Sequence, residues 1–210
     1  ALVTLLAAFL GASYAFKLQS DKEKRDVAKA NIVAGNLAVF NLIRKMNMLL
    51  DYQKQVIEPV RGKITAFIEM PPTLHLLKED IQLDLDSLAF LLSSNDPNLL
   101  GELSLEKSRF QRAVDAINER SKMHLGEVQP ILEKAGIVEC MGYSPKQIEQ
   151  ALGARLNVTM HQATEQVIEH VDSTIVSLQE TGIKLVKMLK KLYPGEQLIS
   201  FAIPESGVEK

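Results

Sequence analysis

Three residues that could bind a metal ion or a small ligand interrupt the apolar pattern of segments that otherwise have helical periodicity. They are Asp84, His124 and His161. A carboxylate and two imidazoles are ordinary ligands for divalent metal ions, and imidazole also serves as an acid or a base near neutral pH. The sequence therefore raises the hypothesis of a polar layer inside a helical bundle.

The heights of these residues along antiparallel helices decide whether they could meet. Asp84 and His124 would each lie about three turns from the shared end of their helices, and His161 somewhat over four turns into the last helix, at ~3.6 residues per turn. A layer at this level could hold a metal ion, a small anion or another ligand. The alternative is that these residues fix the packing register or turn out to solvent, as polar residues in bundles more often do.

No stronger catalytic signal accompanies the polar layer. His161, Glu165 and Glu169 recur every four residues and would share one helix face, which supplies too few ligands for a closed metal site. The chain has no Glu-x-x-His pair of the di-iron bundles, no His-Glu-x-x-His, no phosphate-binding loop and no Gly-x-Ser-x-Gly. We therefore expect a protein that is not an enzyme and that uses no cofactor and no metal.

The composition restricts the class of protein further. Of the 210 residues, 46% are hydrophobic and 24% are charged, which is ordinary for a folded domain. The net charge of -2 provides no general attraction to nucleic acid, and the absence of tryptophan disfavours a base-stacking surface. Cys140 is the single cysteine, so the chain can form neither an internal disulfide nor a thiolate metal cage.

Three interpretations compete for the first sixteen residues, which carry no charged side chain. As a helix they would span about 24 Å, slightly short of a ~30 Å hydrocarbon core, and snorkelling of Lys17 would close the gap. They could instead be a secretory signal, with small residues at Ser13 and Ala15 before the cut, or a helix buried in a large domain. We favour a membrane anchor, because no proline interrupts the pattern before Lys54.

Both the anchor and the secretory signal place the body of the protein beyond the membrane, and we expect it to be periplasmic. Four basic residues follow the apolar segment: Lys17, Lys22, Lys24 and Arg25. Because basic flanks tend to remain cytoplasmic, a cytoplasmic body stays open as the alternative.

The remainder of the chain has the periodicity of amphipathic helices. From Val39 to Phe67, apolar residues recur at alternating steps of four and three, as in helices packed at shallow angles and in coiled coils. This pattern passes through Pro59, where we expect a kinked continuation, and Pro71-Pro72 ends it. Thr73 would then cap a second helix that runs through Leu91.

Two further helices complete the pattern. After a turn at residues 93–97, Ser104 would cap a third helix that ends at Gly136. The best local signal is Ser144-Pro145-Lys146-Gln147, which has a capping serine, a proline at the first helical position and a glutamine that reaches back. The long helix that follows would end at Tyr193-Pro194-Gly195.

These elements predict an all-α protein, an antiparallel four-helix bundle with long first and last helices. Residues 1–16 would be the transmembrane anchor or signal peptide, residues 17–195 the bundle, and residues 196–210 a C-terminal tail. The end of the last helix would return towards the membrane. Four lysines could then bind anionic lipid, or simply complement the helix dipole in solvent: Lys184, Lys187, Lys190 and Lys191.

The function that these expectations favour is binding. We expect a membrane-anchored, non-catalytic interaction or sensory module, an accessory or scaffold subunit of a membrane protein assembly. In general shape it resembles the helical extracytoplasmic domains of bacterial receptors. Its partners would be membrane lipid, through the N-terminal segment, and a protein partner or a second copy of the chain, with no role for nucleic acid. The alternative is a bundle that binds a metal or a small ligand, or is an enzyme, through the layer of Asp84, His124 and His161.

Overall fold

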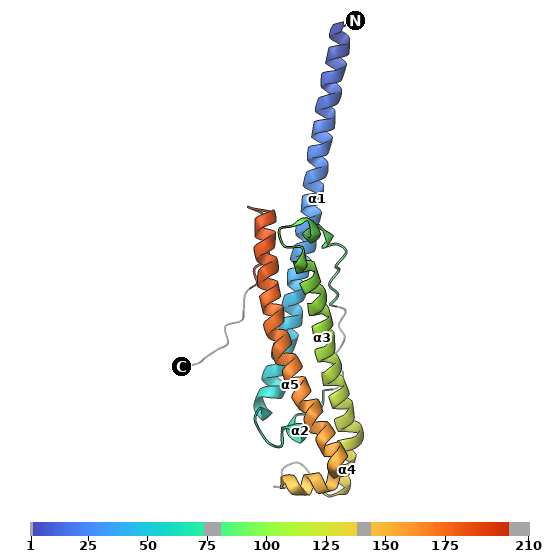
Figure 1. Cartoon of the computed structure of the whole chain (residues 1–210), viewed down its shortest axis with the longest axis vertical. Helices are drawn as coiled ribbons and strands as arrows, with labels where there is room; N and C mark the ends of the chain where they lie inside the picture. Colours follow the sequence, from blue (N-terminus) through green and yellow to red (C-terminus); the bar gives the residue numbers. More distant parts are fainter. Residues whose placement is uncertain (1, 74–80, 138–143, 202–210) are drawn as a thin grey trace, which may run out of the picture.

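Three long helices form the body of the protein (Figure 1). The computed structural model describes residues 2–73, 81–137 and 144–201, with side chains from residue 9 onward, and these ranges contain helices and connections but no strand, in agreement with the predicted all-α class. The long helices are α1 (Leu2–Tyr52), α3 (Asn98–Met123) and α5 (Pro145–Leu192). Helix α5 runs antiparallel to α1 and α3 and packs against both.

Helix α1 is unbroken over 51 residues, which corresponds to about 76 Å at 1.5 Å per residue. Its C-terminal part supplies core side chains such as Val39, Leu42 and Met46. Its N-terminal part projects alone beyond the other helices (Figure 1), and the side chains of residues 9–27 are exposed. The apolar segment and the amphipathic helix therefore form one rod, as the absence of proline predicted.

The predicted first helix passes through Pro59 in altered form, as expected, but it ends at Val60 and does not continue to Pro71-Pro72. After α1 the chain forms a π-helix, η1 (Gln53–Ile57), and then a 3-10 turn, η2 (Glu58–Val60). Proline has no N–H to donate and its ring crowds the carbonyl four residues back, so regular helical bonding fails around it. Gly62 then reverses the chain at a φ of 77°, which glycine adopts without strain, and a single turn follows as α2 (Ala66–Glu69).

The predicted second helix is also wrong over the part that the structure describes, and residues 74–80 lie outside the described ranges. Residues 81–88 are not helical, and a 3-10 turn, η3 (Ala89–Ser93), follows them. Ile81 and Leu83 are buried while Gln82 is exposed, the alternation of an extended chain. The described chain thus forms three long helices and a return segment, residues 81–97, in place of four helices (Figure 1).

Helix α3 confirms most of the third predicted helix but begins six residues before Ser104, directly after Pro97. It continues through a π-helix, η4 (His124–Val128), into α4 (Gln129–Lys134). Gly136 has a φ of 70°, so the chain leaves the helix where the sequence predicted.

The predicted start of the last helix is confirmed. The Ser144 side chain accepts from the Gln147 N–H at 3.3 Å, and the Gln147 side chain accepts from the Ser144 N–H at 2.9 Å. Gly153, at a φ of 74°, breaks α5 after its first two turns. Those turns close the lower end of the bundle in a small apolar cluster of Phe67, Val128, Ile148, Leu152 and Met160.

The main core lies between the three long helices, and it contains most of the predicted seam. Ile117 and Leu178 are fully buried, whereas Leu50 is only half-buried and its neighbour Leu49 takes the core position. The C-terminal tail packs on this body as far as the structure describes it. The Asn36 side chain donates to the Gln197 carbonyl at 3.2 Å and accepts from the Ile199 N–H at 2.9 Å.

Candidate functional site

The two predicted site histidines lie against the short helix α2. The His124 Nε2 is 3.2 Å from the Ile68 carbonyl oxygen, and the His161 ring lies on the Phe67 ring with centroids 3.8 Å apart. Both imidazoles therefore contact neighbouring residues of one connection. These contacts fasten α2 to the long helices.

Asp84 lies elsewhere. Its exposed carboxylate accepts from the backbone N–H groups of Asp86, at 3.2 Å, and Ser87, at 3.3 Å. Two residues before Asp84, the Gln82 carbonyl accepts from the Asn41 side chain of α1. Asn41 lies eleven residues, or about 16 Å, along α1 from Tyr52, and it is Tyr52 that contacts Met70 beside α2. The structure thus separates Asp84 from the histidines. Among the described residues, no group of three or more His, Cys, Asp or Glu side chains is placed to hold a metal ion.

A buried arginine that the sequence did not single out organises the region around α2. Arg120 is 1% exposed and donates to the carbonyls of Phe67, at 3.0 Å, and Pro71, at 3.4 Å, and to the Thr164 hydroxyl at 3.4 Å. Burial lowers the pKa of Arg120 to about 10, and the nearby Tyr52 opposes this shift. The polar residues here connect α3 and α5 to α2 and the residues beside it. They therefore serve the packing of the helices, which is the alternative to a ligand site.

A second set of buried polar contacts, around Lys45 and Glu106, connects all three long helices. Lys45 of α1 is 2% exposed, and its ammonium lies 4.9 Å from the centre of the Phe110 ring. Burial and the neighbouring Lys107 lower the pKa of Lys45 to about 8, against the attraction of Glu106. The buried Glu106 carboxylate accepts from Arg109 at 2.6 Å and from the Ser177 hydroxyl of α5.

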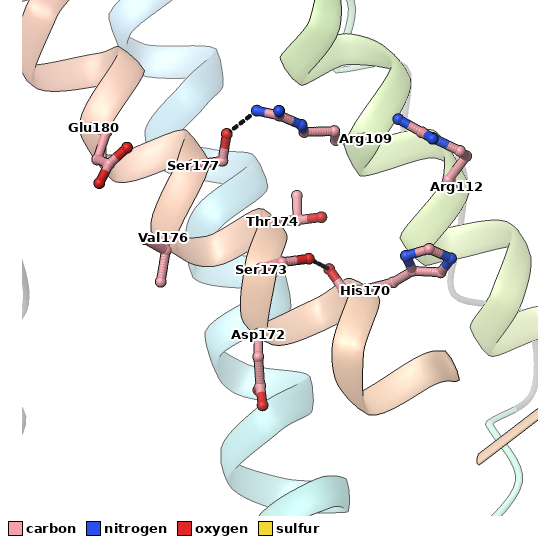
Figure 2. Close-up of a pocket in the computed structure, with 9 residues that line it drawn as sticks. All are labelled: Arg109, Arg112, His170, Asp172, Ser173, Thr174, Val176, Ser177 and Glu180. Atoms are coloured by element: carbon pink, nitrogen blue, oxygen red, sulfur yellow. Dashed lines mark hydrogen bonds between the residues drawn. The ribbon is translucent and has the colours of Figure 1, made fainter. Parts of the chain in front are cut away.

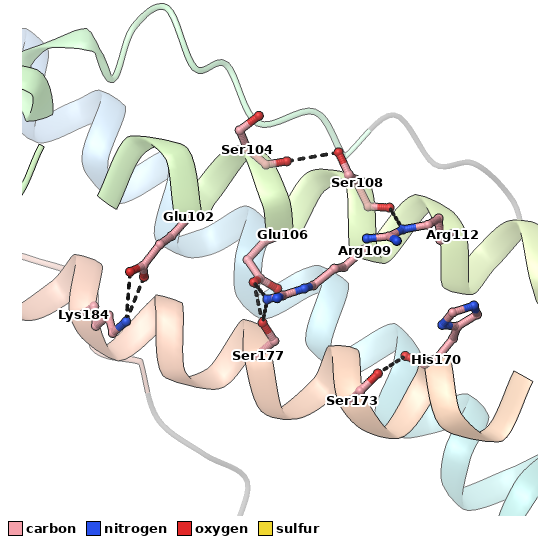
Figure 3. A network of polar contacts seen from close by, with 10 residues as sticks. All are labelled: Glu102, Ser104, Glu106, Ser108, Arg109, Arg112, His170, Ser173, Ser177 and Lys184. Carbon is pink, nitrogen blue, oxygen red and sulfur yellow. Dashed lines mark hydrogen bonds and ion pairs between the residues drawn. The ribbon is translucent and has the colours of Figure 1, made fainter. Parts of the chain in front are cut away.

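Polar side chains join α3 to α5 in a regular antiparallel seam (Figure 3). At one level, Lys184 pairs with Glu102 at 2.9 Å. About two turns along, Arg109 and Ser177 meet beside Glu106. The seam is closed at both of these levels by bonds between the two helices.

The seam opens at the next level into a groove of about 740 Å³ (Figure 2). Here Arg112 of α3 faces His170 and Ser173 of α5. Each binds its own helix: Arg112 donates to the Ser108 carbonyl at 3.4 Å, Ser173 to the Glu169 carbonyl at 2.7 Å, and His170 lies 3.3 Å from the Gln166 amide. The lining also includes Arg109, Asp172, Thr174, Val176, Ser177 and Glu180.

The two acidic residues of the lining, Asp172 and Glu180, lie away from Arg112 at its centre. Asp172 points away from Arg112 in Figure 2 and forms a bidentate ion pair with Arg61, with oxygen–nitrogen distances of 2.8 and 2.9 Å. Glu180 lies exposed at the opposite rim. Arg112, His170 and the serine hydroxyls therefore face the open volume between the helices.

The predicted membrane-proximal lysines lie at the C-terminal end of α5, and all four are exposed. This end meets α1 at Gly35, where an added Cβ would come within 2.6 Å of the Leu189 side chain. Towards the N-terminus, α1 extends eighteen residues, or about 27 Å, from Gly35 to Lys17. This distance separates the lysine end of α5 from the predicted end of the apolar segment.

No helix within the described residues combines the length and the apolar character needed to cross a membrane. The side chains of residues 1–8, the first half of the predicted anchor, lie outside the described residues. No family model matches the chain, and no curated protein or solved structure matches it significantly.

Proposed function

We propose that the chain is a membrane-anchored helical module that works by binding, as an accessory or scaffold subunit of a membrane assembly. The exposure of apolar side chains on the projecting part of α1 carries the proposal. Phe9 is 68% exposed and Phe16 is 73% exposed, with Leu10 and Tyr14 between them. A helix that is apolar on every side is stable when lipid or protein surrounds it, since covering each large side chain contributes about 1.5–3 kcal/mol.

Under this proposal, residues 1–16 lie in the bilayer and Lys17 lies at its surface. The charged stretch that follows stands in water, and the three-helix body begins about 27 Å further along the rod, at Gly35. The basic residues nearest the headgroups are then Lys17, Lys22, Lys24 and Arg25, and the lysines of α5 lie too far away.

A protein partner or a second copy of the chain would bind near the base of the projecting rod. Val33, Leu37 and Phe40 are 67%, 53% and 47% exposed, and they recur at steps of four and three along one face of α1. The Arg44 guanidinium lies 5.8 Å from the Phe40 ring and extends this face. An apolar face of this spacing is suited to a partner helix.

Fractionation with N-terminal mapping tests the anchor. The full chain should stay in membranes after alkaline carbonate washing, dissolve in detergent, and keep residues 1–16. Leu10→Lys should weaken retention, because a charge near the bilayer centre costs about 3 kcal/mol, whereas Leu18→Lys should not. An intact chain found in the soluble fraction would contradict the proposal, and a mature N-terminus after Ala15 would show a cleaved signal.

Extraction in mild detergent tests the partner. The protein should elute with a defined protein partner or as a homo-oligomer, and Leu37→Glu should release it while the body stays folded. Leu105→Glu is the matched control, because Leu105 is equally exposed at 53% but lies on α3. A monomer that brings no other protein with it would count against this part of the proposal.

A further inference from the structure

We infer that the groove between α3 and α5 binds a small, water-soluble ligand that carries a phosphate group. Its lining side chains are Arg112, His170 and Ser173, with Val176 at the side (Figure 2). The phosphate site itself is argued from the contacts of the described body alone, whereas the choice of a water-soluble ligand over a lipid rests on the proposed anchor.

The first argument is the interruption of the polar seam. At the two neighbouring levels, side chains of α3 and α5 bond directly to each other, as in Lys184–Glu102 and Arg109–Ser177. At the level of Arg112, the same kind of side chains turn back to their own helices, and the space between them is open (Figure 3). A ligand that accepts hydrogen bonds from both helices would continue the seam across this gap.

The second argument is the chemistry of the donors. Arg112 uses only its Nε in the described structure, so its two terminal nitrogens are available as the fork that suits phosphate oxygens. The His170 ring faces it from α5, and the Ser173 hydroxyl lies next to His170, where it would turn from the Glu169 carbonyl to donate to the ligand. Of the two carboxylates in the groove's lining, that of Asp172 is paired with Arg61, and that of Glu180 lies exposed at the rim.

The size of the groove indicates a ligand larger than phosphate itself. Its volume of about 740 Å³ lies within the roughly 300–1,000 Å³ of small-molecule sites. Val176, which is 55% exposed, adds an apolar side chain to the lining on the side of Asp172, away from Arg112 (Figure 2). A phosphomonoester with a small organic group fits these dimensions.

The position of the groove excludes a lipid of the membrane that would hold the anchor. Ser173 lies sixteen residues, or about 24 Å, below Leu189, which marks the level of Gly35. The rod adds about 27 Å from Gly35 to Lys17. This step alone rests on the proposed anchor, and it favours a soluble ligand over a headgroup.

Calorimetric titration of the full chain in neutral detergent, with phosphorus NMR as a second readout, tests the inference. Glycerol 3-phosphate should bind with a Kd of about 1 mM or tighter, and glycerol should not bind. Arg112→Gln should weaken binding at least tenfold, because it removes a charge-assisted donor pair. Lys122→Gln removes another exposed cation of α3, one that lies outside the groove, and the affinity of this variant should equal that of wild type.

Three results would overturn the inference. The first is the absence of binding at about 10 mM glycerol 3-phosphate with the protein shown to be folded by circular dichroism. The second is equal weakening in Arg112→Gln and Lys122→Gln, which would mean diffuse attraction. The third is displacement by phosphatidylglycerol vesicles, which would assign the site to lipid. None of these results bears on membrane retention, so this inference and the proposed anchor can fail separately.

Discussion

Replacement of the buried Lys45 by methionine should remove a pH dependence from the stability of the fold. In the folded protein the pKa of Lys45 is about 8, chiefly because burial penalises the ammonium, against 10.5 for an ordinary lysine. Between these two values the unfolded chain binds a proton that the folded chain has released. Unfolding then takes up a proton, so the stability of wild type should rise with pH above about 8.

The expected size of this effect follows from the surroundings of Lys45. A pKa near 8 in place of 10.5 corresponds to about 3 kcal/mol of penalty on the buried ammonium. Part of this difference is recovered at each pH between the two pKa values. We therefore expect wild type to gain about 2 kcal/mol in unfolding free energy between about pH 8 and about pH 10.

Urea unfolding of the full chain in neutral detergent, followed by far-ultraviolet circular dichroism, measures this gain. The measurements should span about pH 7.5 to about pH 10. Higher pH is avoided, because burial raises the pKa of Tyr52 and the unfolded chain then ionises this phenol first, which lowers stability.

Below about pH 9.5, where Arg120 with its pKa of about 10 still holds its proton, the slope with pH should vanish in Lys45→Met and persist in Lys122→Met, whose lysine is exposed. The reasoning is refuted if wild type shows no rise between about pH 8 and about pH 10, or if Lys45→Met keeps the rise below about pH 9.5.

Three further changes test the packing. Leu178→Ala should cost about 2–5 kcal/mol and Leu105→Ala less than about 1 kcal/mol in urea unfolding, because Leu178 is fully buried and Leu105 is 53% exposed; equal costs would contradict the core assignment. Gly182→Ala should free the C-terminal tail to proteolysis, because the new Cβ would lie 2.2 Å from the Phe201 ring, and an unchanged digestion pattern would contradict that contact. Arg120→Met should lower the unfolding free energy by about 1–3 kcal/mol, because it leaves the buried Phe67 carbonyl, and the partly buried Pro71 carbonyl, without this donor, and a gain in stability would show that guanidinium burial costs more.

The parts of the fold that the sequence predicted correctly depend on neighbours along the chain. The start of α5 follows from the exchange of hydrogen bonds between Ser144 and Gln147, which are three residues apart. The continuity of α1 follows from the absence of proline before Pro59. Such signals act within one or two turns, so they hold whatever the rest of the chain does.

The prediction of the second helix is wrong because its apolar residues fit both the period of a helix and the alternation of an extended chain. Leu88 and Leu91 suit a helix, but Ile81, Leu83 and Leu85 alternate with polar residues, as in an extended segment. The extended form buries Ile81 and Leu83 while Asp84 turns out to solvent. The alternation of residues 81–85 is the local signal for the extended segment.

The candidate site shows the same limit. The predicted layer of Asp84, His124 and His161 assumed that Asp84 lies on a helix, about three turns from its start. Because residues 81–88 are not helical, Asp84 does not lie at that level. The groove depends on which faces of α3 and α5 meet. The three-residue spacings of Arg109 with Arg112, and of His170 with Ser173, are visible in the sequence. Their opposition across the groove depends on the packing register, which no local pattern fixes.

The labelling of single cysteines along α1 tests the central claim most directly. In a Cys140→Ser background, Phe9→Cys should resist a membrane-impermeant maleimide in opened membranes and react only after detergent is added. Val27→Cys, on the same rod but beyond the apolar segment, should react at once. If Phe9→Cys reacts as fast as Val27→Cys in intact bilayers, the first residues of α1 lie in water and the proposed membrane anchor is wrong.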